Sequence, residues 1–136
     1  MKGTYLLVIE LPTTTMIQVG KQGMMQFERG WYGYIGSALN GLDQRIRRHL
    51  SPHKKIHWHI DYLLAHAAVK QVYYKESMRR EECHIAHAFE QTLRSMPRFG
   101  CSDCACASHL FFGPAEKIIR TATSLHMTLY ILDANS

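Results

Sequence analysis

The sequence predicts one α+β domain in which a small mixed or antiparallel β-sheet is flanked by helices. The chain has 136 residues and a mass of 15.7 kDa, which is enough for one compact core but not for two. β-Branched and aromatic residues gather in short runs near its start, and helical and strand-like apolar patterns alternate after them. The resulting order, β-β-β-α-α-β-α-β-α-β, is typical of a sheet with helices packed on it.

Three strands are expected first, at residues 4–11, 16–19 and 31–36. Pro12 ends the first strand, and Gly30 opens the third, which is rich in aromatic residues and glycine. Because the connections are short, we expect these three strands to form an antiparallel sheet.

Helices and strands alternate in the rest of the chain. Leu42, Ile46 and Leu50 recur at helical spacing before Pro52, which predicts a helix there. The remaining expected elements are a helix at 57–68, a strand at 69–74, helices at 80–93 and 114–123, and strands at 109–112 and 127–132. No internal repeat or linker interrupts them, so residues 1–136 are expected to form a single domain.

Composition narrows the class of protein. Apolar residues make up 46%, charged residues 20%, and the mean hydropathy is −0.20, values that disfavour wholesale disorder and a membrane-embedded fold. No export signal or membrane-spanning run is evident, so we expect a cytoplasmic protein with no membrane partner. In that compartment cysteines are expected to be reduced thiols or metal ligands. The cysteines are Cys83, Cys101, Cys104 and Cys106.

The net charge of +5 comes from one short segment. Acids and bases cancel before and after it, and between Arg45 and Lys55 there is no acid. The five bases are Arg45, Arg47, Arg48, Lys54 and Lys55. A basic run of this kind is typical of a surface that faces phosphate. An ordinary solvated helix and loop is the alternative, and it is the favoured interpretation for Arg47 and Arg48.

Two further sequence patterns indicate candidate catalytic or ligand-binding residues. Glu82 falls in the middle of the apolar stripe of the helix expected at 80–93, where a carboxylate is costly unless it is paired, bound to metal or at a cleft. Interaction with the helix dipole is the alternative explanation. Arg45 and His49 lie four residues apart and so share one helix face, from which an arginine can reach a phosphate.

Paired tripeptides on the first and third strands carry a family resemblance. Gly3-Thr4-Tyr5 and Tyr34-Ile35-Gly36 resemble the motifs of the GIY-YIG nuclease superfamily, although Thr4 stands where isoleucine is usual and the insert at 12–30 is long. The residues that match its later motifs are Ser37, Arg45, His49 and Glu82. The chain is most similar to the Uri-type branch, which shares the runs at 36–38, 57–62 and 99–104.

This resemblance implies a metal-dependent endonuclease that hydrolyses DNA phosphodiester bonds. Glu82 would hold one Mg²⁺ or Mn²⁺. Tyr5 would deprotonate or position the attacking water, helped by the positive charge of Arg45, and Tyr34 would bind the water or a phosphate oxygen. His49 would bind phosphate or relay a proton.

The resemblance and the local charge together also predict how DNA would be bound. The expected DNA contacts are Ser37, Arg47, Arg48, Lys54 and Lys55. Related domains occur joined to DNA-repair glycosylases, so a role in DNA repair, with a homodimer or a repair protein as partner, is expected.

Other interpretations stay open. Cys101, Cys104, Cys106 and His109 have enough ligands for structural zinc, but their spacing is crowded, and reduced cysteines in a tight loop are the alternative. His57, His59 and Asp61 diverge on a helix, which favours a structural or substrate-edge role. The alternatives to a nuclease are a non-catalytic nucleic-acid-binding module and a zinc-stabilised interaction domain.

Overall fold

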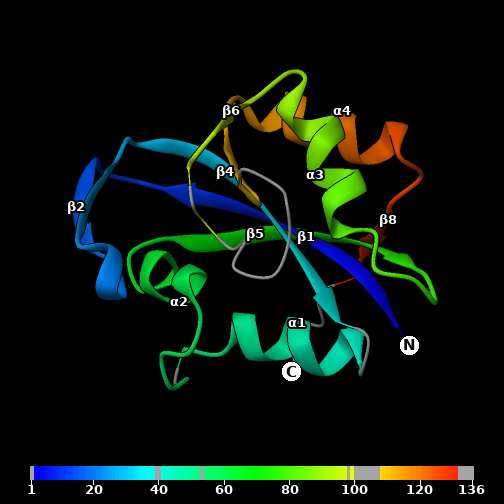
Figure 1. Ribbon diagram of the computed structural model, residues 1–136, viewed down its shortest axis with the longest axis horizontal. Coiled ribbons are helices and arrows are strands. Elements are labelled where there is room, and N and C mark those ends of the chain that lie inside the picture. Colours follow the sequence, from blue (N-terminus) through cyan, green and yellow to red (C-terminus); the bar gives the residue numbers. More distant parts are fainter. Residues whose placement is uncertain (1, 39–40, 53, 98, 100–107, 132–136) are drawn as a thin grey trace.

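The computed structural model describes residues 2–38, 41–52, 54–97, 99 and 108–131. Within these ranges the chain forms a six-stranded antiparallel sheet, a separate two-stranded hairpin and four α-helices, which confirms the predicted α+β class (Figure 1). The strands are β1 (Gly3–Leu11), β2 (Thr15–Gln18), β3 (Met24–Phe27), β4 (Gly30–Ala38), β5 (Ala68–Glu76), β6 (Arg94–Ser95), β7 (Leu110–Phe112) and β8 (Thr128–Tyr130). The helices are α1 (Leu42–Leu50), α2 (His59–Leu64), α3 (Glu82–Glu90) and α4 (Ala115–Ser124).

The first strand lies at the centre of the main sheet, whose order is β6-β7-β4-β1-β5-β8. β1 pairs with β4 along its whole length, from Gly3 opposite Ala38 to Leu11 opposite Gly30, and with β5 on its other edge. Because successive side chains of a strand point to opposite faces, this register decides which residues of β1 and β4 can meet.

Helices cover both faces of the sheet. Figure 1 shows α3 and α4 on one side and α1 and α2 on the other. Each side has its own apolar cluster. The cluster on the α1/α2 side includes Tyr5, Leu7, Ile9, Tyr34, Ile46 and Ile60. The cluster on the α3/α4 side includes Leu6, Val8, Ile35, Phe89, Phe111 and Ile118.

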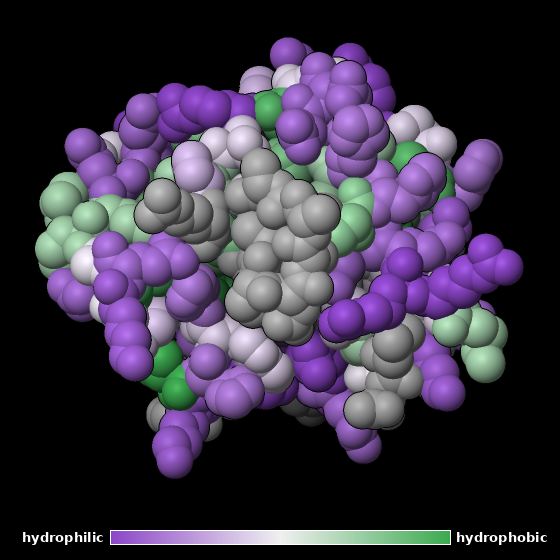
Figure 2. Space-filling view, in the orientation of Figure 1, coloured by the Kyte–Doolittle hydropathy of each residue, from purple (hydrophilic) through white to green (hydrophobic). Residues whose placement is uncertain are grey.

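The second expected strand does not join the main sheet. Residues 15–18 pair instead with β3, a strand that the sequence did not predict. Gly20 and Gly23, with φ of +49° and +85°, allow the chain to reverse its direction between β2 and β3. In Figure 2 this hairpin shows a hydrophobic patch on an otherwise mostly hydrophilic face, and its exposed side chains include Met16 and Met24.

Two expected helices are shorter than predicted. The helix expected at 57–68 is confined to α2: it starts at His59, because Trp58 is still extended, and it ends at Leu64, before β5 begins at Ala68. The helix expected at 80–93 ends at Glu90, and the chain then forms the short strand β6 against β7.

Candidate active site

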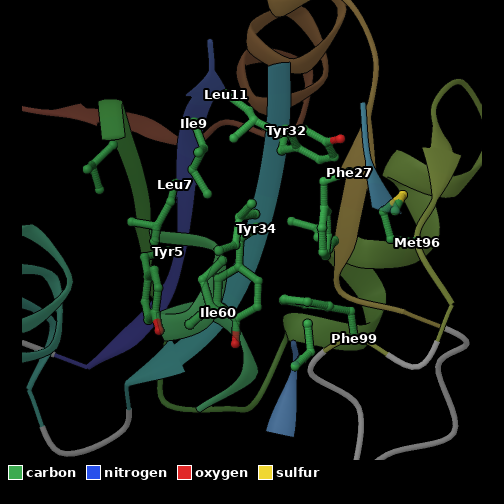
Figure 3. Close-up of a cluster of buried hydrophobic side chains, with 14 of the residues drawn as sticks. Tyr5, Leu7, Ile9, Leu11, Phe27, Tyr32, Tyr34, Ile60, Met96 and Phe99 are labelled. Carbon is green, nitrogen blue, oxygen red and sulfur yellow. The ribbon is translucent and has the colours of Figure 1, made fainter. Parts of the chain in front are cut away.

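Two tyrosines project from the centre of the sheet toward α1 and α2. Tyr5 on β1 and Tyr34 on β4 belong to the same buried cluster, and their hydroxyl groups point the same way in Figure 3. Tyr34 lies opposite Leu7, which is two positions after Tyr5 on the adjacent strand. Side chains two positions apart on a strand share a face, so Tyr5 and Tyr34 lie on the same side of the sheet. The two tripeptide motifs therefore bring two phenols to one side of the sheet.

The glycines of these motifs make room for their neighbours. Gly36 lies directly opposite Tyr5, and a Cβ at Gly36 would overlap the phenol ring. At Gly3 a Cβ would overlap the backbone carbonyl of Lys75 on β5. Glycine is thus required by close packing at both positions, and Gly36 in particular makes room for the Tyr5 ring against β4.

Tyr5 and His49 form a buried pair. The Tyr5 hydroxyl and His49 Nε2 share a hydrogen bond of 2.7 Å, and each residue is only 2% exposed. Burial raises the pKa of Tyr5 to about 12, although the charge and hydrogen bond of Arg45 lower it. Burial also lowers the pKa of His49 to about 4. Both side chains are therefore neutral near pH 7.

Arg45 lies beside this pair. Its Nη1 donates a hydrogen bond of 3.1 Å to the backbone carbonyl of Ser37 at the end of β4, and its guanidinium lies 4.5 Å from the ring centroid of Trp58. Arg45 is partly buried and acts on the Tyr5 phenol both through its charge and by hydrogen bonding. A guanidinium in this position keeps its positive charge at any physiological pH.

Tyr34 and Glu82 are the remaining two candidate catalytic residues. The Tyr34 ring packs edge-on against His49, with centroids 6.3 Å apart, and burial raises its pKa, with further contributions from the charges of Tyr5 and Glu82. Glu82 begins α3, its side chain is 13% exposed, and its Oε1 lies 3.6 Å from Arg80 Nη2. The Glu82 carboxylate also raises the pKa of Tyr5. The structure thus brings Tyr5, Tyr34, Arg45 and His49 together on the α1/α2 side, whereas Glu82 lies at the start of α3 and is linked to them through its charge.

The donor set at Glu82 fits a hard, hydrated cation. Among the described residues there is no group of three metal-ligating side chains, so a metal here would have one protein carboxylate and water as its other ligands. Mg²⁺ readily keeps several waters in this way. A cation at Glu82 would also offset the negative charge that raises the pKa of both tyrosines.

The five bases of the basic run have different surroundings. Arg47 and Lys55 are exposed, whereas Lys54 Nζ donates to the carbonyls of His49 and Ser51 at the end of α1. Arg48 was expected on a solvated face, and this was wrong, because its guanidinium is partly buried in an ion pair with Asp61. The charge that remains free to meet a polyanion is therefore smaller than the sequence indicated.

Ser37 contributes through its backbone. Its carbonyl accepts the hydrogen bond from Arg45, while its hydroxyl oxygen is buried and has no hydrogen-bond partner in the described part of the chain. The expected contact of the Ser37 side chain with DNA stays a prediction.

Two important residues were not assigned to the site from the sequence. Asp61 is 1% exposed and accepts hydrogen bonds from Arg48 and from the backbone N–H groups of His57 and Trp58. Trp58 lies against both Arg45 and Arg48. The sequence signal for this arrangement is an acidic residue three positions after an aromatic one, shortly after an acid-free basic run. The structural role expected of Asp61 agrees with these contacts.

The cysteine cluster cannot be placed in the same way. Cys101, Cys104 and Cys106 lie outside the described residues. His109 is buried, and its Nε2 lies 3.9 Å from the sulfur of Cys83 at the start of α3. Cys83 is disulfide-bonded, so the expectation of reduced thiols was wrong for this residue. Zinc at the predicted cluster stays a prediction.

In the parts of the chain that the structure describes, no helix is long and apolar enough to cross a membrane.

Comparison with known protein families places the chain in one of them. The model of a family described as a domain of unknown function, DUF123, matches residues 4–131, and the chain belongs to this family. No curated protein and no solved structure matches it.

Proposed function

We propose that the protein is a metal-dependent endonuclease that hydrolyses DNA phosphodiester bonds, of the Uri-type branch of the GIY-YIG superfamily. The observation that carries the proposal is the buried Tyr5–His49 hydrogen bond beside the positive charge of Arg45. A phenol, an imidazole and a guanidinium in one largely apolar layer are costly to bury, and their joint presence is explained by chemistry at that point.

In this proposal Tyr5 positions the attacking water and passes a proton to His49. Because the pKa of Tyr5 is about 12, the phenol does not act as a preformed base. Instead, the Tyr5 proton moves to Nε2 of the neutral His49 as the phenol oxygen takes a proton from water. The water oxygen bonds to phosphorus, the scissile P–O bond breaks, and the leaving oxygen takes a proton from solvent.

Charge stabilisation is divided among three residues. Arg45 offsets the negative charge that grows on the phosphate, and Tyr34 donates a hydrogen bond to a phosphate oxygen or to the water. Glu82 would hold Mg²⁺ or Mn²⁺, which supplies Lewis-acid stabilisation when bound. The exposed, positively charged side chains of Arg47 and Lys55 would hold the DNA backbone outside the site.

The test is cleavage of supercoiled, nicked, flap and single-stranded DNA with Mg²⁺ or Mn²⁺. Nicked and flap DNA, which are repair intermediates, are tested first, because the chain resembles domains that occur joined to DNA-repair enzymes. We expect Glu82→Gln, Arg45→Ala and Tyr5→Phe each to lower the rate by about 10²–10⁴-fold, and Glu90→Gln, at the exposed far end of α3, to leave it unchanged. Absence of cleavage by the unaltered protein, or cleavage that survives both Glu82→Gln and Arg45→Ala, contradicts the proposal.

A non-catalytic nucleic-acid-binding module is the second candidate. It is favoured by the burial of Tyr5 and His49 and by the high pKa of the phenol, since neither side chain is exposed to a substrate in this conformation. It predicts DNA binding that weakens with salt, is unaffected by Glu82→Gln and is accompanied by no turnover. Binding and cleavage measured on the same variants separate the two candidates.

A further inference from the structure

Trp58 lies where the proposed site meets the rest of α1. Its ring centroid is 4.5 Å from the guanidinium carbon of Arg45, 4.2 Å from that of Arg48 and 5.9 Å from the ring of His49. Cations are attracted to the face of an indole at such distances. One aromatic side chain from the start of α2 thus contacts three residues of α1, two of which belong to the proposed site.

The two guanidiniums that share this ring differ in their charge balance. Arg48 donates from Nη1 and Nη2 to the two carboxylate oxygens of Asp61, at 3.1 and 2.9 Å. Bidentate pairing fixes the orientation of an arginine as well as neutralising it. Arg45 has no acidic partner among the ion pairs of the described residues. Its positive charge is therefore left for Tyr5 and the substrate.

Asp61 also holds Trp58 itself. Its Oδ2 accepts hydrogen bonds of 2.9 Å from the backbone N–H groups of Trp58 and His57, so the carboxylate fixes the start of α2 as well as Arg48. Burial raises the pKa of Asp61, but the hydrogen bonds from Arg48, Trp58 and His57 outweigh it and hold the pKa below its usual range. The carboxylate is thus ionised at neutral pH, and in this state it accepts the hydrogen bonds from Arg48, His57 and Trp58.

We propose that Trp58, held by the Arg48–Asp61 ion pair, is a positioning residue that fixes the guanidinium of Arg45 against Tyr5. In the described part of the chain, the guanidinium of Arg45 donates one hydrogen bond to the backbone, to the Ser37 carbonyl at 3.1 Å, and one such contact leaves a long side chain with several rotamers. The indole removes that freedom. The inference rests on the proposed nuclease function, because it assigns Trp58 to the orientation of a catalytic charge.

The experiment compares Trp58→Leu and Trp58→Phe with Trp31→Leu. Trp31 is the other tryptophan, and it packs on the α3/α4 side of the sheet. The first readout is the Nε–H resonance of Arg45 in ¹⁵N-labelled protein, assigned by its loss in Arg45→Lys. We expect a ring-current shift and slow exchange in the unaltered protein and in Trp31→Leu, loss of both in Trp58→Leu, and partial retention in Trp58→Phe.

The second readout is the kinetics of DNA cleavage. We expect Trp58→Leu to lower kcat about 10- to 100-fold with little change in KM, and Trp58→Phe to recover part of it. An Arg45 resonance that is the same in both Trp58 variants as in the unaltered protein overturns the proposal, and so does an equal loss of kcat in Trp31→Leu. If Trp58→Leu does not fold, Trp58→Phe carries the test. Cleavage of DNA by the unaltered protein tests the proposed function separately. The Arg45 resonance tests the role of Trp58 even if the protein does not cleave DNA.

Discussion

The two faces of the central sheet are built from the same strands but differ in chemistry. β1 sends Tyr5 toward α1 and α2, where it pairs with His49, and the acid Asp61 is buried in α2 on the same side. The next residues of β1 that face α3 and α4 are Leu6 and Val8, which pack in an apolar cluster. Buried ionisable groups cost stability unless they are paired, so His49 and Asp61 mark the α1/α2 side as the candidate functional layer, which Glu82 would join from the start of α3.

The largest expected effect is on the packing face. Phe89 of α3 is fully buried, and its ring lies 5.8 Å from that of Phe111. We expect Phe89→Ala to lower the free energy of unfolding by about 4 kcal/mol, through lost burial and the cavity left behind, while cleavage per folded molecule is kept. Denaturant unfolding at constant m-value measures this loss. A loss of activity greater than the loss of folded protein would break the division between the faces.

On the site face, stability should depend on pH through His49. Its pKa falls from 6.5 to about 4 on folding, mainly because burial disfavours the charged ring. Between these values the unfolded chain binds more protons than the folded one, so stability is lost as pH falls from 6.5 toward 4, by about 3 kcal/mol in all. We expect His49→Gln to flatten this part of the unfolding profile and His87→Gln, exposed on α3, to leave it unchanged. The same slope in both variants would contradict the assignment.

Two glycines of β4 provide an intermediate test. A Cβ at Gly36 would overlap the Tyr5 ring, whereas a Cβ at Gly33 would lie 3.2 Å from Ile118 and Leu6 side chains on the other face. We expect Gly36→Ala to cost about 1–3 kcal/mol and to lower cleavage, because the phenol must move. Gly33→Ala should cost less, since aliphatic side chains can shift, and should preserve cleavage. Equal activity in the two variants at equal folded fraction would argue against a role for the Tyr5 position.

The smallest effect is expected at the surface. Lys55 and Arg120 are both exposed, the first beside the site face and the second on α4. We expect Lys55→Ala to change stability by less than about 0.5 kcal/mol and to reduce the salt dependence of DNA binding by about one phosphate contact. Arg120→Ala should change neither quantity. Binding titrations at several salt concentrations measure the slope, and an equal change in both variants would show that neither face is preferred.

The sequence predicted the fold class, and periodicity also accounts for the shared faces of two pairs of candidate residues. Alternation along β1 and β4 puts Tyr5 and Tyr34 on one side, and helical spacing puts Arg45 and His49 on one face of α1. The elements that were missed depend on non-local pairing or on exact boundaries. β3 has a weak strand sequence, rich in Met and Gln, and pairs only because two glycines turn it back. The Arg48–Asp61 pair depends on α2 beginning at His59 rather than at residue 57.

The central place of β1 has a consequence for how the chain folds during synthesis. The strand leaves the ribosome before both of its neighbours, and Gly3 lies opposite both Ala38 and Glu76, so its two edges are not covered until β4 and then β5 have been made. Contacts so distant in sequence slow folding. During that interval the apolar run from Leu6 to Ile9 is an unpaired strand of the kind that aggregates or binds chaperones. A chain interrupted before β5 would leave this strand with one open edge.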